Sequence, residues 1–236
     1  MAGGHGRGNQ LNQLNEPTDV IIDRENNALI IADHGNRRVL RWSLDNGERG
    51  QIIISSIDCV GVKMHPDGTL YVADCKRHRV TRWERGANRG TVVAGDNQRG
   101  NRRDQLHAPT YLFVDLDHTV YVSDTKNHRV MKWPQNSTEG TIVAGGNGEG
   151  EGLAQLSLPV GVAVDHFGQI YVTDHGNGRV MRWCEGTNEG TIVVGGNGRE
   201  RQGNQLRFPE GLSFDGEGNL YVADCGNGRI QKFDIN

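Results

Sequence analysis

The stretch "YVTDHGNGRV" at residues 171–180 returns fifty residues later as "YVADCGNGRI" at residues 221–230. The phrase occurs five times along the chain, and its aspartates are Asp33, Asp74, Asp124, Asp174 and Asp224. Successive copies are 41, 50, 50 and 50 residues apart. A nearly constant period in this range indicates an array of similar structural units.

Each unit contains four short segments with strand character. In the fourth unit they read "VGVAVD", "QIYVTD", "GRVMRW" and "GTIVVGG". They are rich in Val, Ile, Tyr and Trp and are separated by turns of Gly, Asn and Asp, whereas no segment has helical spacing. Four antiparallel strands per repeat predict an all-β fold, a β-propeller of five blades in which residues 1–236 form one domain.

The repeated pattern P-x-G-V-x-V-D followed by Y-V-x-D-x-x-N-x-R-V resembles the NHL repeat, and the resemblance covers essentially the whole chain. The phrases "VAGGNG" and "HRVMKW" also resemble NHL-repeat-containing proteins of small invertebrates. The resemblance implies a β-propeller, usually of six blades. A truncated six-bladed ring is therefore the alternative to a ring of five.

The two ends of the chain suggest how the ring closes. The last unit ends after its third strand, at "RIQKFDIN", and the opening residues "MAGGHGRGNQLNQLNEP" match "VVGGNGRERQGNQLRFP" from Val193. We therefore expect residues 1–4 to pair with the last blade as its outer strand. Such a closure would hide the strand edges of the terminal blades.

Composition limits the classes of partner. The chain has 26 Lys and Arg residues against 29 Asp and Glu, so its net charge of −3 favours neither acidic nor basic partners. Its apolar runs are too short for a membrane-spanning helix, and its first ten residues lack the apolar region of a signal peptide. We expect a monomer without membrane insertion, and the compartment, extracellular or cytoplasmic, stays open.

The repeated aspartates and arginines are interpreted as structural. Each Asp is followed five residues later by an Arg, and these are Arg38, Arg79, Arg129, Arg179 and Arg229. A catalytic residue is rarely needed in five copies. An Asp accepts backbone N–H groups in turns, and the forked guanidinium of Arg pairs with carboxylates.

Residues that differ between the copies are the candidates for function, and some of them are expected in the central channel. Alternate residues of each innermost strand face the channel, and small residues are the default there. The exceptions are Asp19, Lys63, Tyr111 and Phe113. They either plug the channel of a small ring, the interpretation we favour, or line a pocket at its mouth.

A second difference lies on the top face, the side that carries the turns after the repeated aspartates. Basic side chains gather there in the second and third units and the loop between them, namely Lys76, Arg77, His78, Arg99, Arg102, Arg103, His107, Lys126 and His128, against only Asp96 and Asp104. This basic sector suits phosphates or acidic peptides, or else it is a solvated rim. The first two copies are only 41 residues apart because the loop that connects the other units is missing between them. We therefore expect a groove there, beside Lys76 and Arg77.

Three further signals concern cysteines, glycosylation and metals. Cys59 and Cys75 flank one hairpin, and a cross-strand disulfide between them is an alternative to two reduced thiols. The triplet "NST" places a glycosylation sequon at Asn136. His34 and His175 follow the repeated aspartates on top turns and His65 begins a bottom turn, so no metal site and no cofactor is predicted.

The sequence therefore favours a non-catalytic scaffold that binds a protein or peptide through its top face. One alternative is the substrate-recognition domain of a RING-type ubiquitin ligase, whose ligase activity would need a RING domain that this sequence lacks. Another is single-stranded RNA binding through the basic sector, although stacking of bases normally needs exposed aromatic residues. No nucleophile motif or separate carboxylate pair suggests an enzyme.

Overall fold

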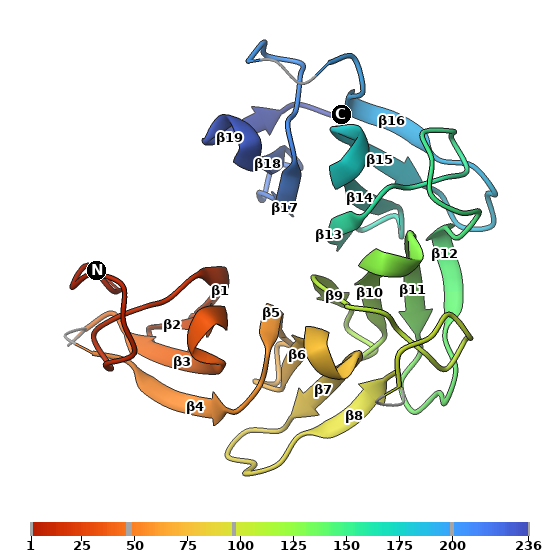
Figure 1. Cartoon of the computed structure of the whole chain (residues 1–236). Helices are drawn as coiled ribbons and strands as arrows, with labels where there is room; N and C mark the ends of the chain where they lie inside the picture. Colours follow the sequence, from red (N-terminus) through yellow and green to blue (C-terminus); the bar gives the residue numbers. More distant parts are fainter. Residues whose placement is uncertain (1, 46–48, 96–97, 199–200, 236) are drawn as a thin grey trace.

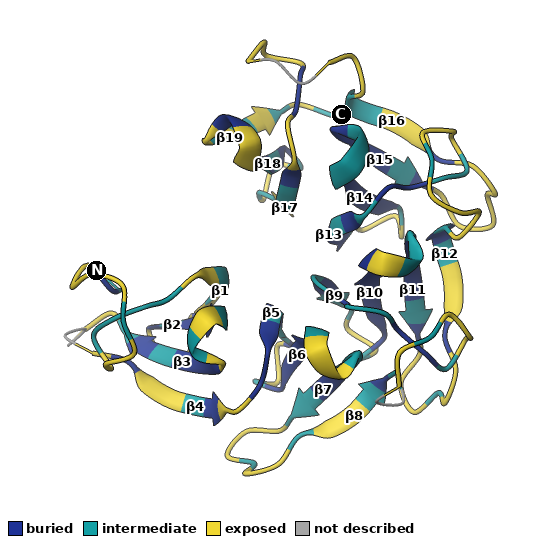
Figure 2. Ribbon diagram, in the orientation of Figure 1, coloured by how far each residue is buried: buried dark blue, intermediate teal, exposed yellow. Residues whose placement is uncertain are grey.

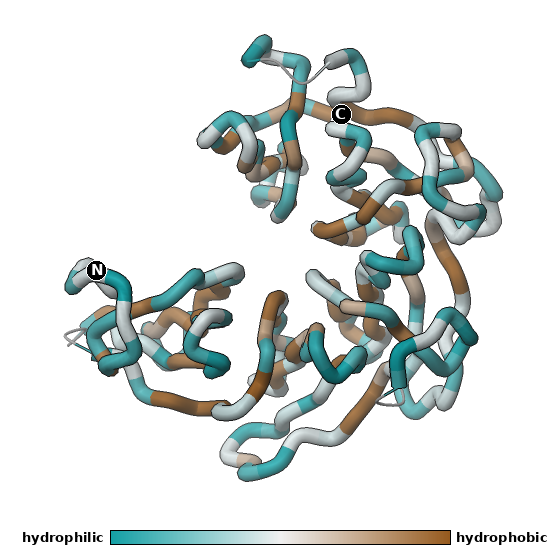
Figure 3. The backbone as a smooth tube through the Cα atoms, viewed as in Figure 1, coloured by the Kyte–Doolittle hydropathy of each residue, from teal (hydrophilic) through white to brown (hydrophobic). Residues whose placement is uncertain are grey.

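Short antiparallel strands build the computed structural model, which describes residues 2–45, 49–95, 98–198 and 201–235 (Figure 1). They form five sheets of consecutive strands arranged as blades around a centre, so the predicted five-bladed β-propeller is confirmed. The hydropathy of the chain follows this plan, with apolar segments along the strands and polar residues in the loops (Figure 3).

The strands of blades 1 to 3 follow the repeat. Blade 1 contains β1 (Pro17–Asp23), β2 (Ala28–Asp33), β3 (Arg38–Ser43) and β4 (Gln51–Ser55). Blade 2 contains β5 (Cys59–Met64), β6 (Leu70–Asp74), β7 (Arg79–Trp83) and β8 (Thr91–Ala94). Blade 3 contains β9 (Leu112–Val114), β10 (Val120–Asp124), β11 (Arg129–Trp133) and β12 (Thr141–Gly145).

Blade 4 repeats this order and blade 5 lacks a fourth strand in the described residues. Blade 4 contains β13 (Pro159–Val164), β14 (Ile170–Asp174), β15 (Arg179–Trp183) and β16 (Thr191–Gly195). Blade 5 contains β17 (Pro209–Phe214), β18 (Leu220–Asp224) and β19 (Arg229–Phe233).

A tight turn joins the second and third strands of every blade. It is a single 3₁₀ turn, and the turns are η1 (His34–Asn36), η2 (Cys75–Arg77), η3 (Thr125–Asn127), η4 (His175–Asn177) and η5 (Cys225–Asn227). The residue after each turn has a left-handed backbone, with φ between 53° and 62°. None of these helical turns of the described chain is long enough to cross a membrane.

The hydrophobic core lies between neighbouring blades. One cluster joins Tyr71 and Val80 of blade 2 to Val122 and Trp133 of blade 3, and similar clusters join the other successive pairs. The second strands β6, β10 and β14 are buried along their whole length, whereas the outer strands are largely exposed (Figure 2). A blade therefore depends on its neighbours for burial.

The expected closure by the N-terminal segment is wrong for the described residues. Blade 5 is a three-stranded sheet, Ala2 packs with Leu14 against blade 1, and Met1 lies outside the described residues. Blade 5 and blade 1 stand apart in Figure 1. The N-terminal segment instead forms the loop that precedes blade 1, with a bridge from Arg7 to Leu14 like the bridge from Glu149 to Leu156 before blade 4.

Candidate functional site

The repeated aspartate and arginine fasten a loop to each blade, as blade 4 illustrates. Asp174 Oδ1 accepts the Ser157 backbone N–H at 2.7 Å, and Asp174 Oδ2 accepts Asn177 Nδ2 and Arg179 Nε at 2.8 and 2.7 Å. The outer nitrogens of Arg179 donate to three loop carbonyls, those of Glu151, Gly152 and Gln155. Asp174 and Arg179 thus bind each other, and their remaining polar atoms bind the loop backbone or the asparagine of the turn.

Blades 1, 3 and 5 repeat this arrangement. The corresponding pairs are Asp33 with Arg38, Asp124 with Arg129 and Asp224 with Arg229, and each Arg donates to three carbonyls of the loop that precedes its blade. Each Asp Oδ1 accepts one N–H from the same loop. The loop therefore lies along the third strand of its blade.

Blade 2 has the pair but not the loop. Strand β4 ends at Ser55 and β5 begins at Cys59. Ile57 precedes Asp74 by the same 17 residues that separate Ser157 from Asp174, yet its N–H donates to Arg37 O at 3.1 Å. Asp74 Oδ1 is buried, and no residue of the described chain hydrogen-bonds to it.

The arginines of blade 2 are rearranged accordingly. Arg79 Nε lies 3.6 Å from Asp74 Oδ2, whereas Arg179 Nε lies 2.7 Å from Asp174 Oδ2. Arg77 replaces the asparagine that the other turns have at this position, and its Nη1 donates to Asp74 Oδ2 and to Ser56 O, both at 3.0 Å. Arg77 supplies the bond to Oδ2 that the asparagine makes elsewhere, but no described residue donates to the buried Oδ1.

The missing loop leaves a groove of about 300 Å³ along β7. It is lined by Ser55, Ser56, Ile57, Asp74, Arg77, Arg79, Thr81, Trp83, Asn88, Arg89 and Gly90. This is the groove that the 41-residue step predicts beside Arg77.

Two further residues that line the groove, Gly90 and Trp83, correspond to a glycine and a tryptophan in blades 1, 3 and 4. Before the fourth strand of blades 1, 3 and 4 a glycine N–H donates to a loop carbonyl, and these glycines are Gly50, Gly140 and Gly190. Gly90 has this position in blade 2. Trp42, Trp133 and Trp183 are each 1% exposed, whereas Trp83 is only half-buried. The groove therefore presents a backbone donor and an aromatic surface beside Asp74 and Arg79.

Three of the six lysines and arginines of the predicted basic sector pair with described acidic residues, and these are Lys76, Arg77 and Arg102. Lys76 Nζ lies 3.2 Å from Asp58 Oδ1, and Arg102 donates twice to Asp104, at 2.9 and 3.0 Å. Arg99, Arg103 and Lys126 are exposed on the same sector. Asp96, which the sequence counts here, lies outside the described residues. Ion pairs of this kind reduce the positive field available to a nucleic acid.

The histidines of that sector connect successive blades. His78 Nδ1 accepts the Ala108 N–H at 3.1 Å, and His128 Nδ1 accepts the Leu158 N–H at 3.2 Å. His107 lies edge-on to His78, with ring centroids 5.6 Å apart. Burial, together with the charge of Arg99, lowers the pKa of His107. These rings pack between loops rather than forming a free basic surface.

Two of the predicted channel residues, Tyr111 and Asp19, make hydrogen bonds to other blades. Tyr111 of blade 3 donates its hydroxyl to Thr18 O of blade 1 at 2.5 Å, and burial raises the pKa of its phenol. Asp19 accepts the backbone N–H groups of Val20 and Val62, with its pKa raised by burial and lowered less strongly by Lys63. Tyr111 thus links opposite sides of the ring.

Phe113, the fourth channel candidate, packs between blades. Its ring lies edge-on to Tyr121, with centroids 6.1 Å apart, in the cluster shared by blades 3 and 4. The four candidates therefore do not meet in one pocket.

Cys59 and Cys75 are free thiols, so the disulfide alternative does not hold in this structure. The strand register pairs Cys59 with Asp74 rather than with Cys75, and Cys59 Sγ donates to Arg38 O at 3.2 Å. Asn136 of the sequon is exposed in the turn between β11 and β12, with φ of 62°.

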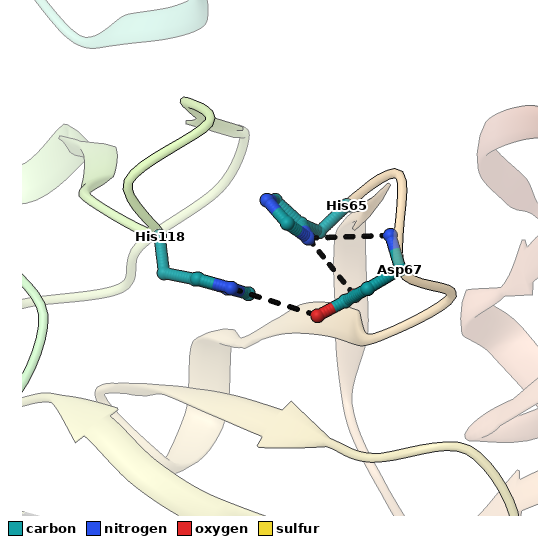
Figure 4. A group of neighbouring side chains, drawn as sticks. All are labelled: His65, Asp67 and His118. Carbon is teal, nitrogen blue, oxygen red and sulfur yellow. Dashed lines mark hydrogen bonds and ion pairs between the residues drawn. The ribbon is translucent and has the colours of Figure 1, made fainter.

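One cluster was missed by the sequence reasoning. His65 and Asp67 in the β5–β6 turn meet His118 in the β9–β10 turn (Figure 4). His65 Nδ1 lies 2.9 Å from Asp67 Oδ1, and His118 Nε2 lies 3.5 Å from Asp67 Oδ2. Burial alone would raise the pKa of Asp67, but the hydrogen bond from the Thr69 N–H contributes to lowering it to about 2. His65 is therefore not isolated, and these residue types can ligate a metal.

Comparisons with known proteins agree with the fold. The NHL repeat family matches residues 58–83, 156–182 and 206–233. No curated protein sequence matches the chain.

Several solved structures have a similar fold at low sequence identity. An auxiliary nutrient binding protein from Bacteroides thetaiotaomicron is 18% identical with a TM-score of 0.72, and the match covers 93% of this chain but only 59% of that one. A gluconolactonase from Xanthomonas campestris is 15% identical (TM-score 0.68; 93% and 76% covered). A chain of the nidogen/laminin complex is 19% identical (TM-score 0.69; 93% and 76% covered). At such identities the similarity concerns the fold alone.

Proposed function

Because the chain is an NHL-repeat β-propeller, we propose that it is a non-catalytic module that binds a peptide segment of a partner protein in the groove along β7. The observation that carries the proposal is Asp74 Oδ1, a buried acceptor with no partner in the described chain. In each of the other four blades the same atom accepts an N–H from a loop. A buried carboxylate oxygen without a donor is costly, so a ligand N–H at this point is strongly favoured.

The remaining contacts define the chemistry of the ligand. The arginine of the pair donates to loop carbonyls in the other blades, and the glycine before the fourth strand does so in three of them. The same groups, Arg79 and Gly90, line the groove of blade 2. They suit a turn-forming peptide that offers one N–H and several carbonyls, and the half-buried Trp83 suits an apolar side chain beside them.

The charge around the groove favours an acidic peptide. Arg77, Arg79 and Arg89 line it, whereas Lys76, two residues after Asp74, is paired with Asp58. The loop of blade 4, "NGEGEGLAQLSL" at residues 147–158, has the required backbone pattern and two glutamates. This loop sequence is therefore the natural probe.

The groove has the composition of a binding surface. Its lining, as far as the structure describes it, includes no histidine and no cysteine that could serve as base or nucleophile. The gluconolactonase name of one similar fold raises lactone hydrolysis as the competing activity. Turnover of a sugar lactone by the purified chain would contradict the non-catalytic part of the proposal.

The test is fluorescence anisotropy with a labelled peptide of residues 147–158. We expect saturable one-to-one binding, and no comparable binding of a scrambled peptide of identical composition. Arg79→Met should weaken the affinity at least about 10-fold, since it removes charge-assisted hydrogen bonds worth about 1.5–3 kcal/mol each.

The matched control is Arg85→Met. Arg85 pairs with Glu25 on the surface and does not line the groove, so its loss should leave the affinity unchanged. Equal binding of the scrambled peptide, or equal affinity of Arg79→Met and the wild type, would refute the groove as the binding site.

A further inference from the structure

The turns of two neighbouring blades bring three ligating side chains to one point. All ligand atoms of His65, Asp67 and His118 lie within 4.8 Å of one another, and Asp67 reaches both imidazoles (Figure 4). Tetrahedral zinc, with bonds of about 2.0–2.2 Å, holds adjacent ligand atoms roughly 3.3–3.6 Å apart. His118 Nε2 lies 3.5 Å from Asp67 Oδ2, within this range, and His65 Nδ1 lies 2.9 Å from Asp67 Oδ1, below it. The two imidazoles stack with ring centroids 3.7 Å apart, so the rings must turn slightly for both nitrogens to bind one ion.

The other ring nitrogens already have partners. Tyr71 Oη lies 2.8 Å from His118 Nδ1, which leaves Nε2 facing Asp67. His65 Nε2 lies 3.3 Å from Leu116 O, and because a carbonyl only accepts, this nitrogen carries the proton. Outer partners of this kind fix the tautomer and orientation of metal-binding histidines.

While the His65 ring is neutral its proton is on Nε2, and Nδ1 is then an acceptor that faces another acceptor. It accepts the Asp67 N–H at 3.3 Å, yet it lies 2.9 Å from the Asp67 carboxylate. Two lone pairs at this separation repel each other. A cation bound between them removes the repulsion and uses both atoms as ligands.

Comparison with the other repeats shows independently that His65 is an exception at its position. Asp115, Asp165 and Asp215 have its position in blades 3, 4 and 5, and each accepts two N–H groups of its own turn. In blade 2 the imidazole of His65 replaces this turn-stabilising carboxylate.

His118 departs from the repeat more sharply. Its position is held by Gly68, Gly168 and Gly218 in the turns of blades 2, 4 and 5, where φ is 76° to 87°. His118 itself has φ of 59°, a conformation that costs energy in a residue with a Cβ. Both exceptions to the repeat therefore occur where the two side chains meet.

We propose that His65, Asp67 and His118 bind a divalent transition-metal ion, with Zn²⁺ as the best fit, and that the ion links the turns of blades 2 and 3. Two imidazoles and one carboxylate suit zinc better than Ca²⁺ or Mg²⁺, which prefer all-oxygen sites. None of the three residues lines the groove along β7, so the site is independent of peptide binding.

The experiment is a calorimetric titration of the full chain, freed of metal by a chelator and carrying no histidine tag, with ZnCl₂. We expect one ion per chain and a Tm that rises with free Zn²⁺ as linkage requires. His118→Gly should abolish this binding, and it should fold because glycine is the residue of the other turns. Tyr71→Phe should weaken binding about 10- to 100-fold, the range for a lost outer partner.

The control is His166→Ala, which removes an exposed histidine from the corresponding turn of blade 4 and should leave zinc binding intact. Should His118→Gly fold poorly, Asp67→Asn provides the same test. The absence of saturable binding to the wild type would overturn the proposal. So would undiminished affinity in a folded His118→Gly or Asp67→Asn variant.

Discussion

Arg79 Nε lies 3.6 Å from Asp74 Oδ2, whereas the corresponding atoms of the other four blades lie 2.6 to 2.7 Å apart. The loop explains the difference, because its carbonyls hold the guanidinium against the carboxylate wherever it is present. Without the loop, the same two residue types line the groove along β7. The pair of Asp and Arg is repeated in five blades, and we propose that it binds a peptide in the one blade that lacks the loop.

The first prediction compares the two aspartates. Asp174→Ala should lower the free energy of unfolding by about 3–5 kcal/mol, because it leaves the buried Arg179 without its carboxylate. Asp74→Ala should cost only about 1 kcal/mol, since Asp74 secures no loop and its arginines are partly exposed. Urea denaturation of both variants measures the difference. Equal losses would mean that Asp74 is as fully engaged as Asp174.

The second prediction concerns two equivalent glycines near the centre of the ring. A Cβ on Gly161 would lie 2.3 Å from Glu210 O, whereas a Cβ on Gly211 would meet only the Tyr111 ring, at 3.9 Å. Gly161→Ala should therefore destabilise the fold by about 1–3 kcal/mol through overpacking. Gly211→Ala should change stability by less than about 0.5 kcal/mol. A shift of the urea midpoint in Gly211→Ala alone would contradict the packing between blades 4 and 5.

The third prediction concerns cysteine reactivity. Burial raises the pKa of Cys59 from 9.0 to about 12. Cys59 should therefore resist a thiol reagent from pH 7 to 10 in the native protein, while the exposed Cys184 and Cys225 are modified. Because the folded state binds this proton more tightly than the unfolded state, the stabilising contribution exists below about pH 9 and is lost as the pH rises toward 12.

Counting modified thiols by mass spectrometry in native buffer and in urea checks this prediction. Rapid native labelling of Cys59 would show that its packing against Arg38 O is not stable.

The number of blades and the position of the groove could be predicted from the sequence, because both follow from the spacing of the repeated aspartates. The 50-residue copies define the blades, and the single 41-residue step marks the missing loop beside Arg77. The alignment of the opening residues with the segment from Val193 was also sound. Its structural consequence was not, since such a loop is fastened to the blade that follows it, through Arg38 in this case.

The histidine cluster was not accessible by spacing. His65 and His118 are 53 residues apart on different blades, and no local motif links them. The signal lay in departures from the repeat, a histidine in place of the turn aspartate and another in place of the turn glycine. Departures of this kind acquire meaning only when the ring places the two turns side by side.

Peptide binding along β7 requires that the groove is accessible in the free protein and that it accommodates a loop peptide. Trp83 reports on both, because it is half-buried while Trp42, Trp133 and Trp183 are buried. The decisive measurement is acrylamide quenching of tryptophan fluorescence with increasing peptide of residues 147–158, with Trp83→Phe as the control. We predict that the peptide protects a quenchable fraction that Trp83→Phe lacks. Unchanged quenching at saturating peptide would contradict the proposed binding site.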